Sequence, residues 1–281
     1  MKWIIVFVVA VFSCACEKEY APPSPPLSPT DSSFADRTYL IDTPQTWAPG
    51  KKYPVVFALH GAGGTGSGMR STVRFYETDE RDSCIFIYPD AKVENWEEGC
   101  RCNKPYRLGI DDVGFINYLL SDAIGKYPVD TTRIYAVGFS QGGLFAHNLG
   151  CKLGHRFAAI ASVASAMSVP LSQDCGQPAE KISVMMIYGQ QDKVLPYNGT
   201  DEGSFSLLSA PATAEHWADK LSLNHTAKNQ GVNDYVVLDG YGSAQGDQVL
   251  LYTVTHGDHA WSFTGMNTRE TVLNFFLSHV K

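Results

Sequence analysis

The stretch Arg133–Gly143, RIYAVGFSQGG, decides the fold of this chain. Its first half is apolar over residues 134–137 and predicts a buried β-strand. Its second half, GFSQG at 138–142, has the G-x-S-x-G spacing of a nucleophile elbow, a sharp turn between a strand and a helix. Side chains two residues before and after the serine would clash across such a turn, so glycine occupies both places. The apolar segment 144–149 can form the helix, and the stretch therefore predicts Ser140 as a catalytic nucleophile.

Two segments are candidates for stabilising negative charge next to Ser140. The helix after the serine would point its N-terminus at it, so the N–H of Gln141 is one expected oxyanion donor. The loop HGAGG at 60–64 follows an apolar run, and its glycines suit close approach of the backbone to a ligand. We expect Ala62 to supply the second donor and His60 to contact the substrate. A dinucleotide site is excluded for this loop because no acidic residue ends a following strand in the expected place.

Strand and helix patterns alternate through most of the chain. Strands are expected at 37–43, 53–59, 84–88, 134–137, 157–163, 182–188, 235–238 and 249–254, and helices after Asp111-Asp112, after the elbow, and at 211–221 and 267–280. This alternation predicts an α/β fold, with a mostly parallel central sheet and helices on both faces. Residues 95–108, which are aromatic and charged, are expected to form a surface loop. Ligands of such sheets bind beyond the carboxyl ends of the strands.

A serine hydroxyl needs a base, and in chains with this elbow the acid and the base follow the serine in the order Asp, His. Asp192 follows the strand predicted at 182–188 and is the candidate acid, with a simple turn residue as the alternative. His256 and His259 both follow the last strand. We favour His259 because it lies deeper in its loop and precedes Trp261, which we expect to line the site.

These residues together predict acyl transfer. Ser140 would attack an ester carbonyl while His259 takes its proton and Asp192 orients the imidazole. The oxyanion would lie between the N–H groups of Gln141 and Ala62. The mechanism needs no cofactor and no metal.

A second pair of carboxylates, Asp111 and Asp112, precedes a predicted helix. The pair could serve acid–base catalysis. The simpler interpretation is an N-cap and a favourable charge at a helix start.

The first 33 residues differ in composition from the rest. Residues 1–16 predict a signal peptide, with Lys2 followed by an apolar run too short to span a bilayer comfortably. Cys14 and Cys16 both lie where a lipoprotein signal would be lipidated, and the sequence leaves open which of them is used, or whether the protein is simply secreted. Residues 17–33 form a proline-rich linker, and residues 34–281 the catalytic domain. The expected location is secreted, or an outer-surface or periplasmic lipoprotein.

Charge and cysteine content exclude several functions. The formal net charge of −7 and the lack of a basic run argue against binding to nucleic acid. In an exported protein the cysteines are expected to form disulfides, and Cys100-Arg-Cys102 lacks the spacing of a zinc knuckle. The domain holds five cysteines, so at least one is unpaired. Cys151 and Cys175 flank the strand at 158–165 and are the expected pair.

The motifs together resemble the exported α/β-hydrolases of the polyhydroxybutyrate depolymerase and feruloyl esterase type, within carbohydrate esterase family one. The matching pieces are LHGAGG at 59–64, YPDA at 88–91, DDVGFI at 111–116, VGFSQGG at 137–143, FAAI at 157–160, the segment 189–197 and HAW at 259–261. The resemblance implies that His259 is the base and Asp192 the acid. Ser262 stands where the family usually has proline, and Gln141 where it often has asparagine or alanine, and both departures leave the substrate open.

The resemblance implies a serine carboxylesterase that removes feruloyl or acetyl groups from plant polysaccharide such as xylan. A polyhydroxyalkanoate depolymerase and a general short-chain carboxylesterase remain alternatives. An inactive hydrolase fold that only binds is a third, against which the intact set of Ser140, Asp192 and His259 argues. We expect a monomer with a polysaccharide-linked or small ester as partner, and membrane contact only through an N-terminal lipid anchor, if one is attached.

Overall fold

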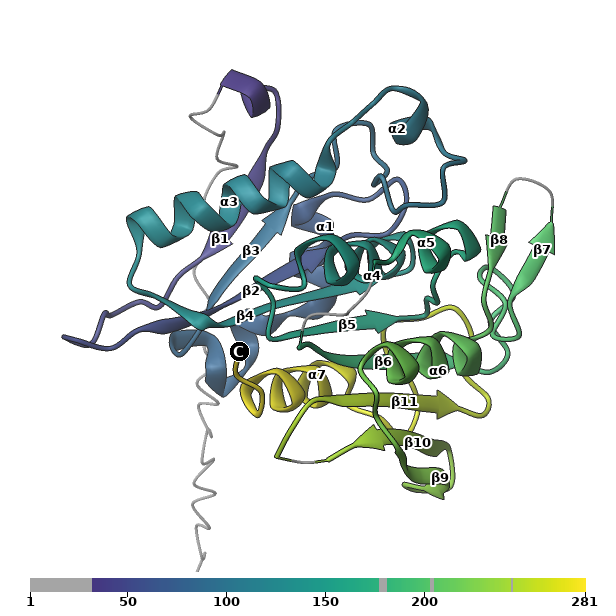
Figure 1. Ribbon diagram of the computed structural model, residues 1–281. Helices are drawn as coiled ribbons and strands as arrows, with labels where there is room; N and C mark the ends of the chain where they lie inside the picture. The colour runs from purple at the N-terminus through teal and green to yellow at the C-terminus, as the bar shows by residue number, and fades with distance from the viewer. Residues whose placement is uncertain (1–31, 177–180, 203–204, 244) are drawn as a thin grey trace, which may run out of the picture.

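The computed structural model describes residues 32–176, 181–202, 205–243 and 245–281 (Figure 1). The predicted signal peptide and all but the last two residues of the predicted linker lie outside the described residues. None of the helices in the described part of the chain is long and apolar enough to cross a membrane.

Nine strands form one sheet within the described residues, in the order β1-β3-β2-β4-β5-β6-β11-β10-β9. The six from β3 to β11 are parallel, and β1, β10 and β9 are antiparallel to their neighbours. The strands are β1 (Tyr39–Asp42), β2 (Tyr53–Leu59), β3 (Ile85–Pro89), β4 (Val129–Phe139), β5 (Ala159–Val163), β6 (Ser183–Gly189), β9 (His225–Gly231), β10 (Val236–Gly242) and β11 (Gln248–Val254). A separate hairpin pairs β7 (Thr200–Glu202) with β8 (Phe205–Leu207).

Helices cover both faces of this sheet, as the sequence predicts. The central strands are buried throughout, and alternate residues of β2 pack on opposite faces: Phe57 in one hydrophobic cluster and Val56 in the other. One face packs against α3 (Asp112–Lys126), α4 (Gln141–Leu153) and α6 (Ala210–Lys220). The other packs against α1 (Gly66–Val73) and α7 (Thr268–Leu277). Figure 1 shows α3 and α7 on opposite sides of the sheet. The short helices α2 (Lys104–Arg107) and α5 (Val169–Asp174) lie in connections.

The predicted elbow joins β4 to α4. Ser140 lies between them with φ 55° and ψ −124°, a conformation that costs a non-glycine residue about 1–3 kcal/mol. A Cβ atom at Gly142 would come within 2.2 Å of the Leu59 carbonyl oxygen, and one at Gly138 within 1.9 Å of the Gly142 oxygen. Both positions therefore require glycine, as the sequence pattern indicates.

The segment 95–108 differs from the surface loop that its composition predicts. Trp96 is fully buried and stacks on Phe145 of α4, with ring centroids 4.8 Å apart. Glu98 and Cys100 are buried as well. The charged residues around Trp96 favour a surface loop in the sequence. In the structure, the single large side chain of Trp96 anchors the loop to the core.

The aspartate pair before α3 has the structural role that the simpler interpretation gives it. Asp111 is the N-cap of α3 and accepts a hydrogen bond from the Gly114 N–H at 2.7 Å. Asp112 is buried and forms an ion pair with Arg37. The two carboxylates therefore serve different neighbours and do not face a common substrate position.

Two disulfides lie in the described residues. One joins Cys151 to Cys175, the pair expected from the sequence, and ties α4 to the end of α5. The other joins Cys100 to Cys102, a pairing that the sequence left open. Among the cysteines that the structure describes, Cys84 is the unpaired one, and it is buried.

Candidate active site

The structure brings Ser140, His259 and Asp192 together at the carboxyl ends of β4, β11 and β6, three parallel strands of the sheet, with β5 between β4 and β6. The Ser140 Oγ lies 2.8 Å from Nε2 of His259, and Nδ1 of the same ring lies 2.7 Å from Oδ2 of Asp192. His259 is 119 residues from Ser140 and 67 residues from Asp192 along the chain. This is the hydrogen-bond geometry of a nucleophile, a base and an orienting carboxylate.

The Asp192 carboxylate is held rigidly by its own loop. Its Oδ1 accepts hydrogen bonds from the N–H groups of Val194 and Leu195, at 2.8 and 2.9 Å, which leaves Oδ2 for the imidazole. The Tyr188 hydroxyl donates to the Leu195 carbonyl oxygen at 3.0 Å and braces the far side of the loop. Asp192 is only 5% exposed, so water competes little for its oxygens.

The loops that carry Asp192 and His259 are bonded directly to each other. The Gln190 N–H donates to the Val254 oxygen and the Gln191 N–H to the Gly257 oxygen, both at 2.9 Å. A Cβ atom at Gly189 would come within 2.4 Å of the Gly257 oxygen, so glycine is what allows the loops to approach this closely. These main-chain hydrogen bonds hold the two loops together and so fix Asp192 and His259 relative to each other.

His256, the alternative base, points elsewhere. Its ring is exposed and contacts only the Gln191 amide at a long 3.4 Å. Asp258 is also exposed, whereas the buried Asp192 bonds the His259 ring. The structure thus places His259, and not its neighbour, over the serine.

The two expected oxyanion donors belong to segments that adjoin Ser140. Gln141 is the first residue of α4, so its N–H has no partner within the helix. The loop that carries Ala62 follows β2, the strand next to β4, and a Cβ atom at Gly61 would lie 3.3 Å from the Ser140 Cβ. Ala62 itself is exposed. Both segments therefore adjoin Ser140, and the role of their N–H groups as oxyanion donors stays a prediction.

His60 and Trp261 occupy positions different from those expected. His60 is 2% exposed and both its ring nitrogens are bonded to main-chain groups, so no polar atom of the ring is left for a substrate. Trp261 is 6% exposed and packs in the core between the sheet and α7. His60 still lines the pocket beside the 60–64 loop, and contact of either residue with a substrate stays a prediction.

A pocket of about 240 Å³ opens next to the serine. It lies between the 60–64 loop and α1, and its walls include Ala62, Met69, Thr72 and Phe139. Phe139, which lines this hollow, has its ring 5.2 Å from the His259 ring, but neither His259 nor Ser140 lines the hollow itself. Mostly small or apolar side chains line it, which suits an apolar acyl group.

One further residue near the site was missed in the sequence. The indole N–H of Trp96 donates to the His60 carbonyl oxygen at 2.9 Å, and the Trp96 main-chain N–H donates to the Gln141 side-chain oxygen at 3.2 Å. A tryptophan within a charged stretch was the available signal, because such a large apolar side chain is highly buried on average.

Within the described residues, one group has the spacing of metal ligands: Glu98, Cys100 and Cys102. The two sulfur atoms are joined in a disulfide, and it is the thiolate that binds metal. The group does not lie among the residues around Ser140.

Comparison with known proteins agrees with this geometry. A family described as Phospholipase/Carboxylesterase matches residues 115–235, less than half of the chain, and this stretch includes Ser140 and Asp192. A probable feruloyl esterase C of Aspergillus clavatus is 30% identical over 168 residues, which cover 58% of this chain and 57% of that protein. Feruloyl esterase B of Piromyces equi is 28% identical over 236 residues, 80% of this chain and 42% of that protein.

The solved structures give the fold. An acetyl xylan esterase from Aspergillus awamori superposes with a TM-score of 0.62 at 14% sequence identity, over 86% of this chain and 94% of that one. The sequence matches span less than two thirds of the length of the two feruloyl esterases. The chain therefore has the α/β-hydrolase fold, and its sequence is similar to that of feruloyl esterases.

Proposed function

We propose that this protein is a serine carboxylesterase. Ser140 attacks the ester carbonyl carbon, His259 accepts the serine proton, and Asp192 orients the ring and stabilises its charged form. The developing oxyanion is bound by the N–H groups of Ala62 and Gln141. His259 then gives its proton to the departing alcohol, and water hydrolyses the acyl-enzyme by the reverse path.

The observation that carries this proposal is the unbroken chain of hydrogen bonds from Ser140 through His259 to Asp192, at 2.8 and 2.7 Å. A base must lie within hydrogen-bond reach of the proton that it removes, and this one does. The strained backbone at Ser140 supports the same role, because strain of this kind clusters at active sites.

For the substrate, we propose feruloyl or acetyl esters of plant polysaccharide. The names of the relatives support this choice: two are feruloyl esterases, and the structural neighbour is an acetyl xylan esterase. The hollow between the 60–64 loop and α1 has room for an acyl group, and it is lined by Phe139, the residue before Ser140. A substrate of this kind lies outside the cell, which agrees with the signal peptide predicted at residues 1–16 and with a secreted or lipid-anchored enzyme.

The first experiment tests the chemistry. The purified domain should hydrolyse p-nitrophenyl acetate and be labelled by a fluorophosphonate, and Ser140→Ala should abolish both reactions. If the wild-type protein shows neither turnover nor labelling, the esterase proposal is wrong, and an inactive hydrolase fold that binds a ligand becomes the better description.

The second experiment tests the substrate. We expect release of ferulate or acetate from feruloylated and acetylated xylo-oligosaccharides, with a higher kcat/KM than for simple short-chain esters. Faster release of hydroxybutyrate from polyester film would identify a depolymerase. Equal rates on all small esters would identify a general carboxylesterase.

A further inference from the structure

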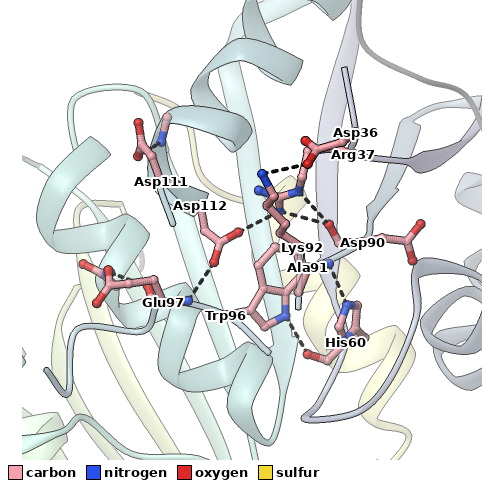
Figure 2. Close-up of polar contacts among 12 residues, drawn as sticks. Asp36, Arg37, His60, Asp90, Ala91, Lys92, Trp96, Glu97, Asp111 and Asp112 are labelled. Carbon is pink, nitrogen blue, oxygen red and sulfur yellow. Dashed lines mark hydrogen bonds and ion pairs between the residues drawn. The ribbon is translucent and has the colours of Figure 1, made fainter. Parts of the chain in front are cut away.

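The imidazole of His60 is hydrogen-bonded on both sides to the main chain, and Figure 2 shows the bond to Ala91. Its Nδ1–H donates to the Gly61 carbonyl oxygen at 2.7 Å, and its Nε2 accepts from the Ala91 N–H at 3.1 Å. The second bond fixes the tautomer, because a ring nitrogen that accepts a hydrogen bond carries no proton. Burial lowers the pKa of His60, which favours the neutral ring that this arrangement needs.

The bond to Gly61 controls the direction of the next N–H. The carbonyl oxygen of Gly61 and the N–H of Ala62 belong to one peptide unit, and in a planar trans peptide they point in opposite directions. That oxygen is held by two donors, the His60 ring and the Gly64 N–H at 3.0 Å. The peptide cannot rotate unless both bonds break, so fixing the oxygen also fixes the Ala62 N–H.

We propose that His60 is a positioning residue that holds the Ala62 N–H toward the oxyanion formed at Ser140. The proposal rests on the esterase function given above. It replaces direct substrate contact by His60 with an indirect role, in which the ring never touches the reacting atoms.

A buried ion pair secures the position of Ala91, the partner of the ring. Arg37 donates to the Asp90 carbonyl oxygen at 3.0 Å and pairs with Asp112 at 2.7 Å, and Figure 2 shows these groups converging above the ring. Asp112 also accepts from the Glu97 N–H at 2.7 Å. Both ends of the segment from Asp90 to Glu97 are thus tied to the start of α3, and the Ala91 N–H is held in place.

The same segment links the two oxyanion donors. Trp96 bonds the His60 carbonyl oxygen with its indole and the Gln141 side chain with its main-chain N–H. One residue, Trp96, therefore contacts both the 60–64 loop, through its side chain, and the Gln141 side chain, through its main chain. On the His60 side, this contact restrains the main chain of the loop that carries Ala62.

The test compares His60→Phe with His60→Asn. Phenylalanine keeps a ring beside Trp96 but removes both hydrogen bonds, whereas the asparagine amide can place an N–H where Nδ1 stands. Each variant is assayed with p-nitrophenyl acetate and with its thionoester, in which sulfur replaces the carbonyl oxygen. Sulfur accepts hydrogen bonds weakly, so the thionoester depends less on oxyanion donors.

We expect His60→Phe to lower kcat for the oxygen ester about 10- to 100-fold, with KM changed less than about twofold, because the lost contact acts in the transition state. The ratio of oxygen-ester to thionoester kcat should fall by a similar factor. His60→Asn should restore most of both quantities.

The control is His147→Phe. His147 is a fully buried histidine on α4 that accepts from the Trp217 indole at 3.0 Å and lies outside the oxyanion segments. This variant should lose stability without changing the substrate ratio. An equal loss on both esters in His60→Phe, or unchanged kcat, would overturn the positioning role and leave the esterase proposal intact. Absence of turnover by the wild type would overturn both.

Discussion

Two histidines three residues apart follow the last parallel strand, and only one of them meets the serine. His259 is mostly shielded from solvent between Ser140 and Asp192, while the exposed His256 ring bonds no group of the site. Comparing variants of the two histidines therefore separates the chemical role of the His259 ring from the general effect of removing a histidine from this loop.

We predict that His259→Ala lowers kcat/KM for p-nitrophenyl acetate by at least about 10³-fold, because the serine loses its base. His256→Ala should change it less than about twofold. Steady-state kinetics with both variants measure the difference, and circular dichroism checks that both are folded. Comparable losses in the two variants would mean that the loop, and not the His259 ring, is what matters.

The carboxylate gives a second test at this scale. Asp192→Asn keeps the size of the side chain but replaces the charged carboxylate by a neutral amide, which presents either its carbonyl oxygen or its NH₂ group to His259. We expect kcat to fall by about 10³- to 10⁴-fold, since the ring loses its preferred tautomer and the stabilisation of its charge. Fluorophosphonate labelling should slow in parallel. Labelling at the wild-type rate would show that Asp192 does not support the base.

Some of these residues could be predicted from the sequence and some could not. Ser140, Asp192 and His259 each follow a recognisable strand, and parallel strands bring their carboxyl ends to one edge. Chain order therefore carries enough information to bring the three together. The orientation of the His60 ring depends on its hydrogen bond with Ala91 and on the nearby ion pair of Arg37 with Asp112. These partners are distant from His60 in the sequence, and no local pattern identifies them.

At the scale of elements, burial decides which predictions were right. Strand β2 has the bounds expected, Tyr53–Leu59, because an apolar run buried on both faces is a strong local signal. Strand β9 was missed, since it is a polar edge strand whose side chains are almost all exposed. It pairs with β10 through main-chain hydrogen bonds, and such bonds leave no pattern of apolar side chains in the sequence. Helix α1 was missed because two of its eight residues are glycine.

The two disulfides close loops of very different length. Cys151 and Cys175 are 24 residues apart, whereas Cys100 and Cys102 are 2 apart. In the chain-entropy view, a cross-link stabilises a fold more when the loop that it closes is longer. The Cys151–Cys175 disulfide should therefore raise the free energy of unfolding of the whole domain. The Cys100–Cys102 disulfide should affect only the local conformation of its loop.

We predict that replacing Cys151 and Cys175 together by alanine lowers the free energy of unfolding by about 3 kcal/mol. Replacing Cys100 and Cys102 together should cost clearly less. Urea unfolding followed by tryptophan fluorescence, under non-reducing conditions, measures both. If the short-loop variant is the less stable of the two, the disulfides act through local packing and loop length is not the controlling quantity.

At the scale of the whole molecule, the buried acid Glu98 couples stability to pH. Burial, reinforced by the nearby charges of Glu97 and Asp112, raises the pKa of Glu98 to about 8, from 4.5 for an unperturbed glutamate. The folded protein therefore keeps a proton on this group over a pH range in which the unfolded chain has released it. Folding then binds a proton, and stability falls as pH rises from about 4.5 to about 8.

Glu98→Gln should remove this dependence. Glutamine keeps an oxygen that can accept from the Asn103 side chain, as Glu98 does, but it cannot ionise. At about 1.4 kcal/mol for each pH unit, the variant should be more stable than the wild type at pH 8 by a few kcal/mol, and the two should be nearly equal at pH 4.5. Taking the difference between the two proteins at each pH cancels the contribution of other titrating groups, including the buried histidines.

Urea unfolding at half-unit steps between pH 4.5 and 9 measures this difference, with Glu94→Gln, an exposed position in the same loop, as the control for removing one negative charge. The gap between Glu98→Gln and the wild type should widen steadily up to about pH 8 and then stay constant. A gap of constant size across the range would mean that Glu98 is ionised in the folded protein at every pH tested. The loop anchored by Trp96, which contacts the His60 carbonyl oxygen and the Gln141 side chain, would then carry a buried negative charge close to Asp112.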